Sequence, residues 1–107
     1  MIYRAVSFLR NQFQIVNGYS NLFYGWGGED DDLYYRVKRA GLDVVRFDKD
    51  VALYKMLSHS KETPNPNRFT TMKKSQQSYA VDGLNNVDYK LIDYELKPMF
   101  THIVVEL

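Results

Sequence analysis

Hydrophobic residues recur at helical spacing between residues 29 and 40. Leu33, Val37 and Ala40 stand three or four positions apart, with charged and aromatic residues between them. This spacing places the apolar side chains on one face of an amphipathic helix. Basic residues in the last turn, with Gly41 directly after it, are typical of a helix C-terminus. We therefore predict a helix over residues 29–40.

Two further segments carry the same helical pattern. The first begins after Ser7, a residue type favoured at the N-cap, and ends at Val16. Asn17 and Gly18 follow it and form a typical C-cap pair. The second covers residues 68–80, and its lysines predict a helix with an exposed, basic face.

Short apolar runs bounded by turn-forming residues predict strands in the rest of the chain. A turn at residues 48–50 separates two such runs, and Pro98 separates two others. We expect the last two runs to pair as a closing β-hairpin. The predicted strands are residues 1–6, 42–47, 51–57, 87–96 and 99–106.

The combination of helical and strand patterns predicts a mixed α/β fold, with a mixed sheet and helices. Residues 19–28 form an aromatic, glycine-rich loop, and residues 82–86 form a turn. Residues 58–67 are polar and contain two prolines, so we expect a long mobile loop there. A chain of 107 residues forms at most one small domain with a modest core.

Charge and composition exclude several classes of protein. The chain has 14 basic and 13 acidic residues, a balance without the basic excess of a nucleic-acid-binding protein. It has no cysteine, which excludes a disulfide framework and a zinc–thiolate site. No signal peptide opens the chain, and no apolar run approaches the length of a membrane span. Nine tyrosines, six phenylalanines and one tryptophan exceed the needs of a small core, so we expect some to line a binding surface.

The candidate chemistry lies where the glycine-rich loop meets the helix predicted over residues 29–40. Trp26 stands among three glycines, and four carboxylates follow at residues 29–32. The helix dipole favours acids in a first turn, but adjacent like charges repel, so capping explains only one or two of the four. We expect ordinary capping for Asp32. Carboxylates make this helix start a poor phosphate cradle, whereas an indole beside acids suits a sugar: the ring covers the C–H face and the acids accept from the hydroxyls. The alternative for Trp26 is a buried core anchor.

The segment from Gly25 to Asp32 resembles the signature of the β-1,4-galactosyltransferase family (glycosyltransferase family 7). Four further motifs match in the family's order and at near-family spacing, and together they span about residues 5–107. These motifs are Asn17-Gly18, Met56 to Ser60, Pro64 to Phe69 and Asp82 to Asn85. The resemblance covers the C-terminal part of the family's catalytic domain, so it implies a partial GT-A-like domain over residues 1–107 that lacks the nucleotide-binding N-terminal half.

The resemblance implies an inverting glycosyltransferase that moves galactose or N-acetylgalactosamine from a UDP-sugar to the 4-hydroxyl of a terminal N-acetylglucosamine or glucose. Asp30 would be the base that deprotonates that hydroxyl, and Trp26 would swing with its glycine-flanked loop. Residues 58–67 would be a lid, and Arg68, Phe69 and Met72 would build the pocket for the acceptor's N-acetyl group. Spacing alone equally allows Phe69 and Met72 to face the core and Arg68 to be solvated. The substrate-binding residues implied are Trp26, Gly27, Gly28, Glu29, Asp31, Arg68, Phe69 and Met72.

Met56 and His59 are the candidate metal ligands. On the sequence alone, a histidine beside a loop is more often a surface side chain, and methionine is a soft donor poorly matched to a hard cation. The resemblance implies that both bind Mn²⁺ with an aspartate from an earlier Asp-x-Asp motif. No such motif precedes residue 17, and residues 48–50, which have those letters, form the predicted turn.

Two classes of function stay open. The first is the transferase, in the Golgi lumen and anchored in the membrane by a segment that lies upstream of this chain. The second is a non-catalytic carbohydrate-binding or interaction module, or an inactive fragment, which keeps the acceptor groove without the donor half. Both use a glycan partner and neither uses a nucleic acid, whereas only the first needs a UDP-sugar.

Overall fold

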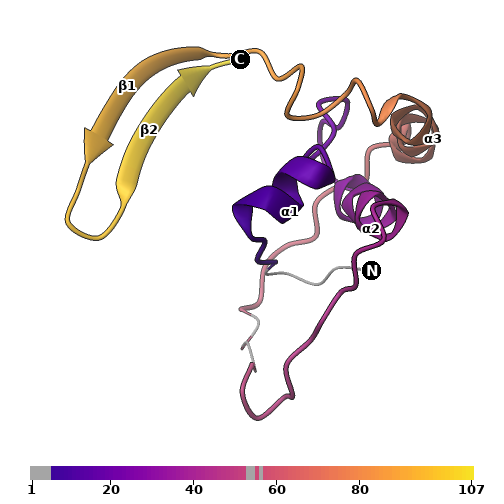
Figure 1. Cartoon of the computed structure of the whole chain (residues 1–107), viewed down its shortest axis with the longest axis horizontal. Coiled ribbons are helices and arrows are strands. Elements are labelled where there is room, and N and C mark those ends of the chain that lie inside the picture. The colour runs from indigo at the N-terminus through magenta and orange to yellow at the C-terminus, as the bar shows by residue number, and fades with distance from the viewer. Residues whose placement is uncertain (1–5, 53–54, 56) are drawn as a thin grey trace.

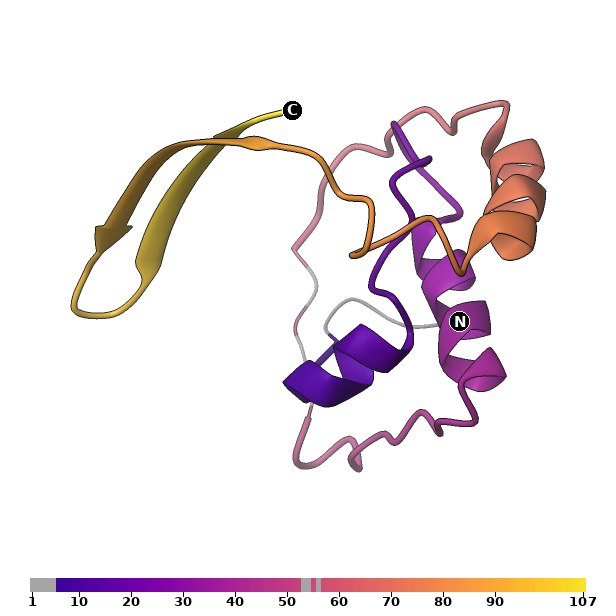
Figure 2. The same cartoon turned by 45° about the horizontal axis from the view of Figure 1, so that its top comes forward.

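Three helices and one β-hairpin form the regular structure of the described part of the chain. The structure is a computed structural model, and it describes residues 6–52, 55 and 57–107. Helices α2 and α3 lie side by side, and α1 lies on the opposite side of α2 from α3 (Figures 1 and 2). The elements are α1 (Arg10–Ile15), α2 (Glu29–Arg39), α3 (Arg68–Ser78), β1 (Lys90–Leu96) and β2 (Thr101–Glu106).

Helix α2 confirms the prediction from hydrophobic spacing within one residue. Gly28 is its N-cap and has φ of 98°, a left-handed conformation that glycine adopts without steric cost. Ala40 is the C-cap of the helix, and the next residue, Gly41, has φ of 71°. All four acids lie in the first turn and three bases lie towards the end, as the helix dipole favours.

The buried face of α2 forms the centre of a small core. Leu33 and Val37 are almost fully buried, together with Val16, which follows α1. Leu33 and Val37 are four residues apart and therefore lie on one face of the helix, which packs against the N-terminal segment. The partly buried residues around them are Phe8, Phe13, Tyr34, Ala40, Leu42 and Val44.

Helix α1 begins later than its sequence predicted. The side-chain oxygen of Gln12 accepts a hydrogen bond from the Leu9 backbone N–H at 3.0 Å, so Leu9 is the N-cap and the prediction of Ser7 was wrong. The predicted C-terminus is confirmed: Asn17 and Gly18 have φ of 59° and 63°. Gly18 N–H reaches back to the Phe13 carbonyl at 3.0 Å, which satisfies a terminal acceptor.

The strands predicted over residues 42–47 and 51–57 do not form among the described residues. The side chains of Leu42 and Val44 pack on the core, whereas Val45 is 81% exposed. Buried and exposed side chains therefore alternate here as they would in a strand. No described strand lies beside this segment to complete a ladder, and a strand needs a hydrogen-bonded partner. The predicted turn at residues 48–50 is confirmed by Val51 N–H, which donates to the Asp48 carbonyl at 3.0 Å. Most of the predicted strand over residues 1–6 lies outside the described residues.

The predicted hairpin is confirmed, with shorter strands. β1 pairs antiparallel with β2 from Lys90 opposite Glu106 to Leu96 opposite Thr101, with an irregularity between Leu91 and Asp93. The hairpin projects away from the helices, and every residue in its two strands is exposed (Figures 1 and 2). The described residues therefore form a two-stranded antiparallel sheet, and the mixed sheet predicted for the fold is not found in this part of the chain.

Candidate functional site

The loop of residues 19–28, called the Trp26 loop below, follows a backbone path that requires its glycines. Gly25, Gly27 and Gly28 all have positive φ, between 71° and 109°, which strongly disfavours residues with a side chain. Trp26 itself is 52% exposed, so it is not the buried core anchor that the sequence also allowed. Its backbone forms an isolated parallel bridge with Pro64, which brings the loop against the segment before α3.

Asn65 fastens the Trp26 loop to that segment. Its side-chain NH₂ donates to the Tyr24 carbonyl at 2.7 Å, and its backbone N–H donates to the Trp26 carbonyl at 3.0 Å. Its side-chain oxygen accepts from the Asn67 N–H at 2.8 Å, immediately before α3 begins. Asn65 thus fixes the backbone on both sides of Gly25, with its side chain on one side and its backbone N–H on the other, and ties it to the N-terminus of α3.

Arg68, the first residue of α3, packs on the same loop. A Cβ placed on Gly27 would lie 3.0 Å from the Arg68 Cδ, a tight contact with that side chain, and the φ of 109° there favours glycine. The Arg68 guanidinium donates to the Asn65 carbonyl at 3.2 Å and lies 4.3 Å from the ring centre of Phe69. The start of α3 and the Trp26 loop therefore form one continuous surface.

The first three acids of α2 remain accessible. Glu29 is exposed, and Asp30 and Asp31 are half-buried. The Asp30 Oδ1 accepts the Asp31 backbone N–H at 2.9 Å, a bond within the first helical turn. These side chains can accept hydrogen bonds from hydroxyl groups, and a carboxylate with one oxygen so oriented can also take up a proton.

Tyr19 is a neighbour of these acids that sequence reasoning missed. Burial raises the pKa of its phenol above the ordinary 10.0, and the negative charges of Glu29 and Asp30 raise it further. The phenol therefore stays a hydrogen-bond donor beside the two acids. Its ring also lies 6.2 Å from that of Phe13, which anchors it to the core side of the loop.

Asp32 is not a helix cap, and that prediction was wrong. The residue is 1% exposed, and its carboxylate accepts hydrogen bonds from Arg36 Nε and Ser75 Oγ, each at 2.9 Å. The other oxygen, Oδ1, is buried without a hydrogen-bond partner. Asp32 therefore belongs to a buried ionic network and is separate from the accessible acids before it.

Arg36 is the centre of that network. Its guanidinium donates to the Asp82 backbone carbonyl at 2.7 Å, to the Asp82 carboxylate at 3.2 Å and to Ser75 Oγ at 2.9 Å. The Asp82 carboxylate in turn accepts from the Ser20 hydroxyl and from the Asn21 N–H at 2.9 Å. The network joins α2, α3 and the start of the aromatic loop. The spacing of four between Asp32 and Arg36 was the only signal for it in the sequence.

Two residues proposed for an acceptor pocket lie on one side of α3. Phe69 is 63% exposed and Met72 is half-buried. The alternative in which Phe69 faces the core is therefore wrong. Arg68 is half-buried and makes the contacts given above, so the alternative in which it is merely solvated is also wrong.

The candidate metal ligands are only partly placed. Met56 lies outside the described residues, and His59 is exposed. The His59 Nδ1 lies 2.8 Å from the Ser60 carbonyl oxygen, which can only accept a hydrogen bond. This contact favours the tautomer with a proton on Nδ1 and leaves the Nε2 lone pair for a cation. Among the described residues no group of three His, Cys, Asp or Glu side chains is arranged to hold a metal ion. His59 can therefore serve as one metal ligand, and the described residues do not supply a complete set of ligands around it.

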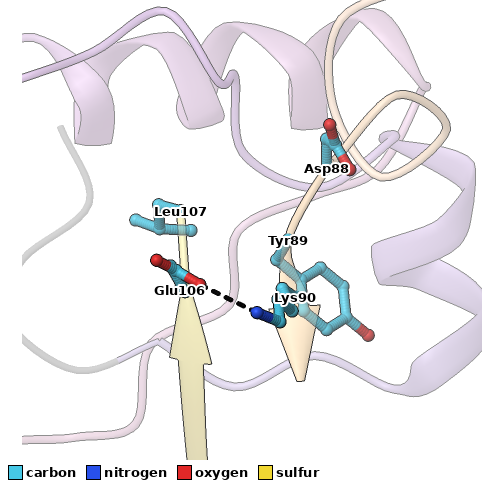
Figure 3. A pocket seen from close by; sticks show the side chains of 5 residues that line it. All are labelled: Asp88, Tyr89, Lys90, Glu106 and Leu107. Carbon is cyan, nitrogen blue, oxygen red and sulfur yellow. Dashed lines mark ion pairs between the residues drawn. The ribbon is translucent and has the colours of Figure 1, made fainter. Parts of the chain in front are cut away.

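A shallow hollow of about 260 Å³ lies elsewhere, at the open end of the hairpin. Figure 3 shows Lys90 spanning it towards Glu106, with Nζ and Oε2 3.5 Å apart. None of its lining residues is a candidate site residue. We therefore define the site by the Trp26 loop and the starts of α2 and α3.

Comparison with known proteins decides the family. A family model described as the N-terminal domain of galactosyltransferase matches residues 5–60, just over half of the chain. The chain belongs to the β-1,4-galactosyltransferase family. The description of that model contradicts the prediction that the chain is the C-terminal part of the catalytic domain, so that detail of the resemblance was wrong.

Relatives within the β-1,4-galactosyltransferase family align over almost the whole chain. Mouse β-1,4-galactosyltransferase 1 is 37% identical over 101 residues, covering 92% of this chain and 25% of the relative. Bovine β-1,4-galactosyltransferase 3 is 38% identical over 100 residues, covering 91% of this chain and 25% of the relative. The chain thus spans about a quarter of the length of these glycosyltransferases.

The fold is similar to that of a solved family member. The catalytic domain of Drosophila β-1,4-galactosyltransferase 7, crystallised in complex with xylobiose, superposes with a TM-score of 0.56 at 23% identity. The match covers 92% of this chain and 45% of that domain, so it supports a partial glycosyltransferase fold. Within the described residues, none of the helices is long and apolar enough to cross a bilayer.

Proposed function

We propose that these residues form the acceptor-binding part of an inverting transferase, which moves galactose or N-acetylgalactosamine from a UDP-sugar to the 4-hydroxyl of a terminal N-acetylglucosamine or glucose. Membership of the family supports galactosyl transfer in general. The observation that carries the proposal is that a half-exposed indole lies on the loop that leads directly into three accessible carboxylates. An aromatic face with hydrogen-bond acceptors at its edge is suited to a sugar ring and its hydroxyls.

Asp30 is the base in this proposal. Its Oδ1 is already oriented by the Asp31 N–H, so we assign proton uptake to Oδ2. Oδ2 takes the proton of the acceptor 4-hydroxyl as that oxygen bonds to the anomeric carbon of the donor. The bond from the anomeric carbon to UDP breaks at the same time, and UDP leaves with the electron pair. A positioned base of this kind contributes about 10²–10⁴-fold in rate.

The other site residues bind and orient. Trp26 covers the apolar face of the sugar, Gly27 and Gly28 allow the loop to approach it, and Glu29 and Asp31 accept from hydroxyl groups. Holding donor and acceptor in line can lower the barrier by roughly 7–11 kcal/mol, so orientation outweighs the base in this reaction.

The proposed pocket for the acceptor's N-acetyl group lies at the start of α3. Phe69 and Met72 stand three residues apart and so share one face of the helix. Arg68 holds the pocket against the Trp26 loop through its contacts with Gly27 and Asn65. An apolar face beside a guanidinium suits an acetamido group, whose methyl and carbonyl need an apolar and a donor contact respectively.

We further propose that Mn²⁺ supports the reaction, with His59 and Met56 among its ligands. The free Nε2 of His59 supports this assignment, and a full ligand set needs at least one residue from outside the described part of the chain. A bound Mn²⁺ would neutralise the charge of the leaving diphosphate. Added Mn²⁺ should selectively broaden the NMR signals of the His59 ring, with the ring of His102 in β2 as an internal control. Equal broadening of both histidines would discard the assignment.

A Golgi location with a membrane anchor outside these 107 residues is part of the same proposal, since the acceptor is a glycan. The second candidate is a carbohydrate-binding module without catalysis. It is favoured by the accessibility of Trp26 and of the first three acids of α2, which binding requires and catalysis alone does not explain.

Two measurements separate these functions. The chain has one tryptophan, so a single indole N–H signal reports Trp26 directly. N-acetylglucosamine should shift that signal in a saturable manner under either function, whereas an unchanged signal would refute both.

The second measurement is galactose transfer by the longest natural form of the protein that contains these residues. Asp30→Asn should lower the rate at least about 10²-fold. Asp43→Asn, the same chemical change at an exposed position four residues after α2, should leave it unchanged. Sugar binding with no transfer by the native protein would establish the module instead.

A further inference from the structure

Asp82 lies where the start of the Trp26 loop meets the buried network of α2. The residue is 4% exposed, so its carboxylate depends on hydrogen-bond donors from the protein. Its Oδ2 accepts from the Arg36 guanidinium at 3.2 Å and also from the Ser20 hydroxyl. Its Oδ1 accepts from the Asn21 backbone N–H at 2.9 Å. One carboxylate therefore joins the loop to the arginine that is also paired with the first turn of α2.

The turn over residues 82–86 holds the loop through a second set of contacts. The Asn21 side-chain NH₂ donates to the Gly83 carbonyl at 2.9 Å and to Asn86 Oδ1 at 2.8 Å. The same Asn86 oxygen accepts from the Gly83 N–H at 2.7 Å, so the turn is hydrogen-bonded within itself. The start of the loop is thus docked on a support whose own conformation is fixed.

The rest of the Trp26 loop has two further attachments. Asn65 holds the carbonyls of Tyr24 and Trp26, and Gly28 is the N-cap of α2. The glycines between these points can adopt many backbone conformations. The position of the indole relative to the acids of α2 therefore depends on the attachments, and the turn supplies the first of them.

We infer that Asp82 is a positioning residue of the sugar site, which acts through Ser20 and Asn21 to hold the Trp26 loop in its binding conformation. This inference rests on the proposed sugar site at Trp26, and Asp82 itself does not touch the sugar. A loop that is already ordered loses less conformational entropy when its ligand binds. Freedom returned to the backbone of one residue should weaken binding roughly fivefold or more.

The test removes the contacts from the side of the loop. Asp82→Ala would also deprive Arg36 of a buried partner and so would mix a loss of stability with a loss of position. Ser20→Ala deletes the hydroxyl, and Asn21→Ala deletes the side-chain amide. Both variants leave the ion pair between Arg36 and Asp82 in place.

Two NMR measurements on the 107-residue chain report the result. The heteronuclear NOE of the Trp26 indole N–H measures motion on the picosecond to nanosecond timescale. The saturable shift of the same signal gives the affinity for N-acetylglucosamine. Each variant should lower the NOE and weaken the sugar at least about fivefold, with a native circular dichroism spectrum.

Asn85→Ala is the matched control. Asn85 belongs to the same turn, and its side chain bonds the Asn17 side chain at 2.9 Å and the Ala80 carbonyl at 2.7 Å, both outside the Trp26 loop. Asn85→Ala should lower the free energy of unfolding in urea about as much as Asn21→Ala, because each deletes two hydrogen bonds made by the side-chain NH₂ or oxygen of an asparagine. It should leave the NOE and the sugar affinity unchanged within about twofold. Ser20→Thr keeps the hydroxyl and should restore both readouts.

The outcomes separate this inference from the proposed function. If Ser20→Ala and Asn21→Ala lower stability alone, as Asn85→Ala does, the turn is only structural and the positioning role is refuted, whereas the sugar site stands. If the native chain does not bind N-acetylglucosamine but both variants still mobilise the indole, the sugar site fails and the dependence of the loop on Asp82 is upheld.

Discussion

Removal of the Arg36 side chain should destabilise the fold more than any exposed substitution. Arg36 is 3% exposed and is the cation that compensates two buried carboxylates, those of Asp32 and Asp82. Arg36→Ala would leave both acids without it, and Ser75 would lose one hydrogen-bond partner. Breaking a buried ion pair by deleting one partner typically costs about 3–5 kcal/mol. The Asp32 Oδ1 already has no partner, so the site has little capacity to compensate.

The assay is urea unfolding at 25 °C, followed by circular dichroism and by Trp26 fluorescence. A small domain has a total stability of about 5–15 kcal/mol, so Arg36→Ala should unfold at much lower urea or be unfolded in water. Arg36→Lys should lie between the native chain and Arg36→Ala, because an ammonium keeps the charge but cannot reach three acceptors in a plane. Lys38→Ala is the matched control, since its ion pair with Asp43 is exposed and should have no measurable effect.

A double variant tests whether charge is the cause. Arg36→Met should lose nearly as much stability as Arg36→Ala, although it fills more of the volume. Asp32→Asn added to Arg36→Met should recover part of the loss, because it neutralises one of the two uncompensated acids. A loss below about 1 kcal/mol for Arg36→Ala, the size of an exposed pair, would refute the assignment of a buried network. So would a double variant less stable than Arg36→Met alone.

Four other predictions follow from particular contacts. The Tyr19 pKa is raised above 10.0 in the folded chain, so as pH rises past 10 the tyrosine ionises first in the unfolded chain and the free energy of unfolding falls. In an ultraviolet titration, Glu29→Gln should lower the Tyr19 pKa but leave it above 10.0, because burial is the larger cause of the shift. Gly83→Ala should cost more than about 1 kcal/mol in urea unfolding, because φ is 154° and the new Cβ would collide with the Asn17 carbonyl oxygen. Leu33→Ala, at a fully buried position, should cost about 2–5 kcal/mol in the same assay. The 107-residue chain alone should give no transfer from UDP-galactose with Mn²⁺, and turnover above background would show that the chain contains a complete donor site.

Segments whose structure depends on near neighbours were predictable. The helix over residues 29–39 follows from apolar spacing and from the glycines at both ends, and the hairpin follows from two apolar runs around a proline turn. The strands predicted over residues 42–47 and 51–57 failed for the opposite reason. A strand is stabilised by hydrogen bonds to another segment, and alternation within one segment does not reveal whether that partner is present.

The candidate site shows the same division. Its chemistry, an indole followed by a row of carboxylates, could be read from residues 26–32, and the family signature from residues 25–32. The sequence could not show that Asn65 fastens the Trp26 loop to the start of α3, because that contact joins segments about 40 residues apart. Tyr19 was missed because its position beside Glu29 and Asp30 depends on the path of the loop.

By itself, then, the sequence determined which side chains are available and which short segments become helix, turn or hairpin. Only the tertiary structure decided which of the four adjacent acids stay accessible and which one is buried. Asp30 and Asp31 stay accessible, whereas Asp32 faces Ser75, which is 43 residues away in the chain, and is buried with Arg36. Successive residues of a helix point in different directions, and the partner that each direction meets is set by how the helices pack.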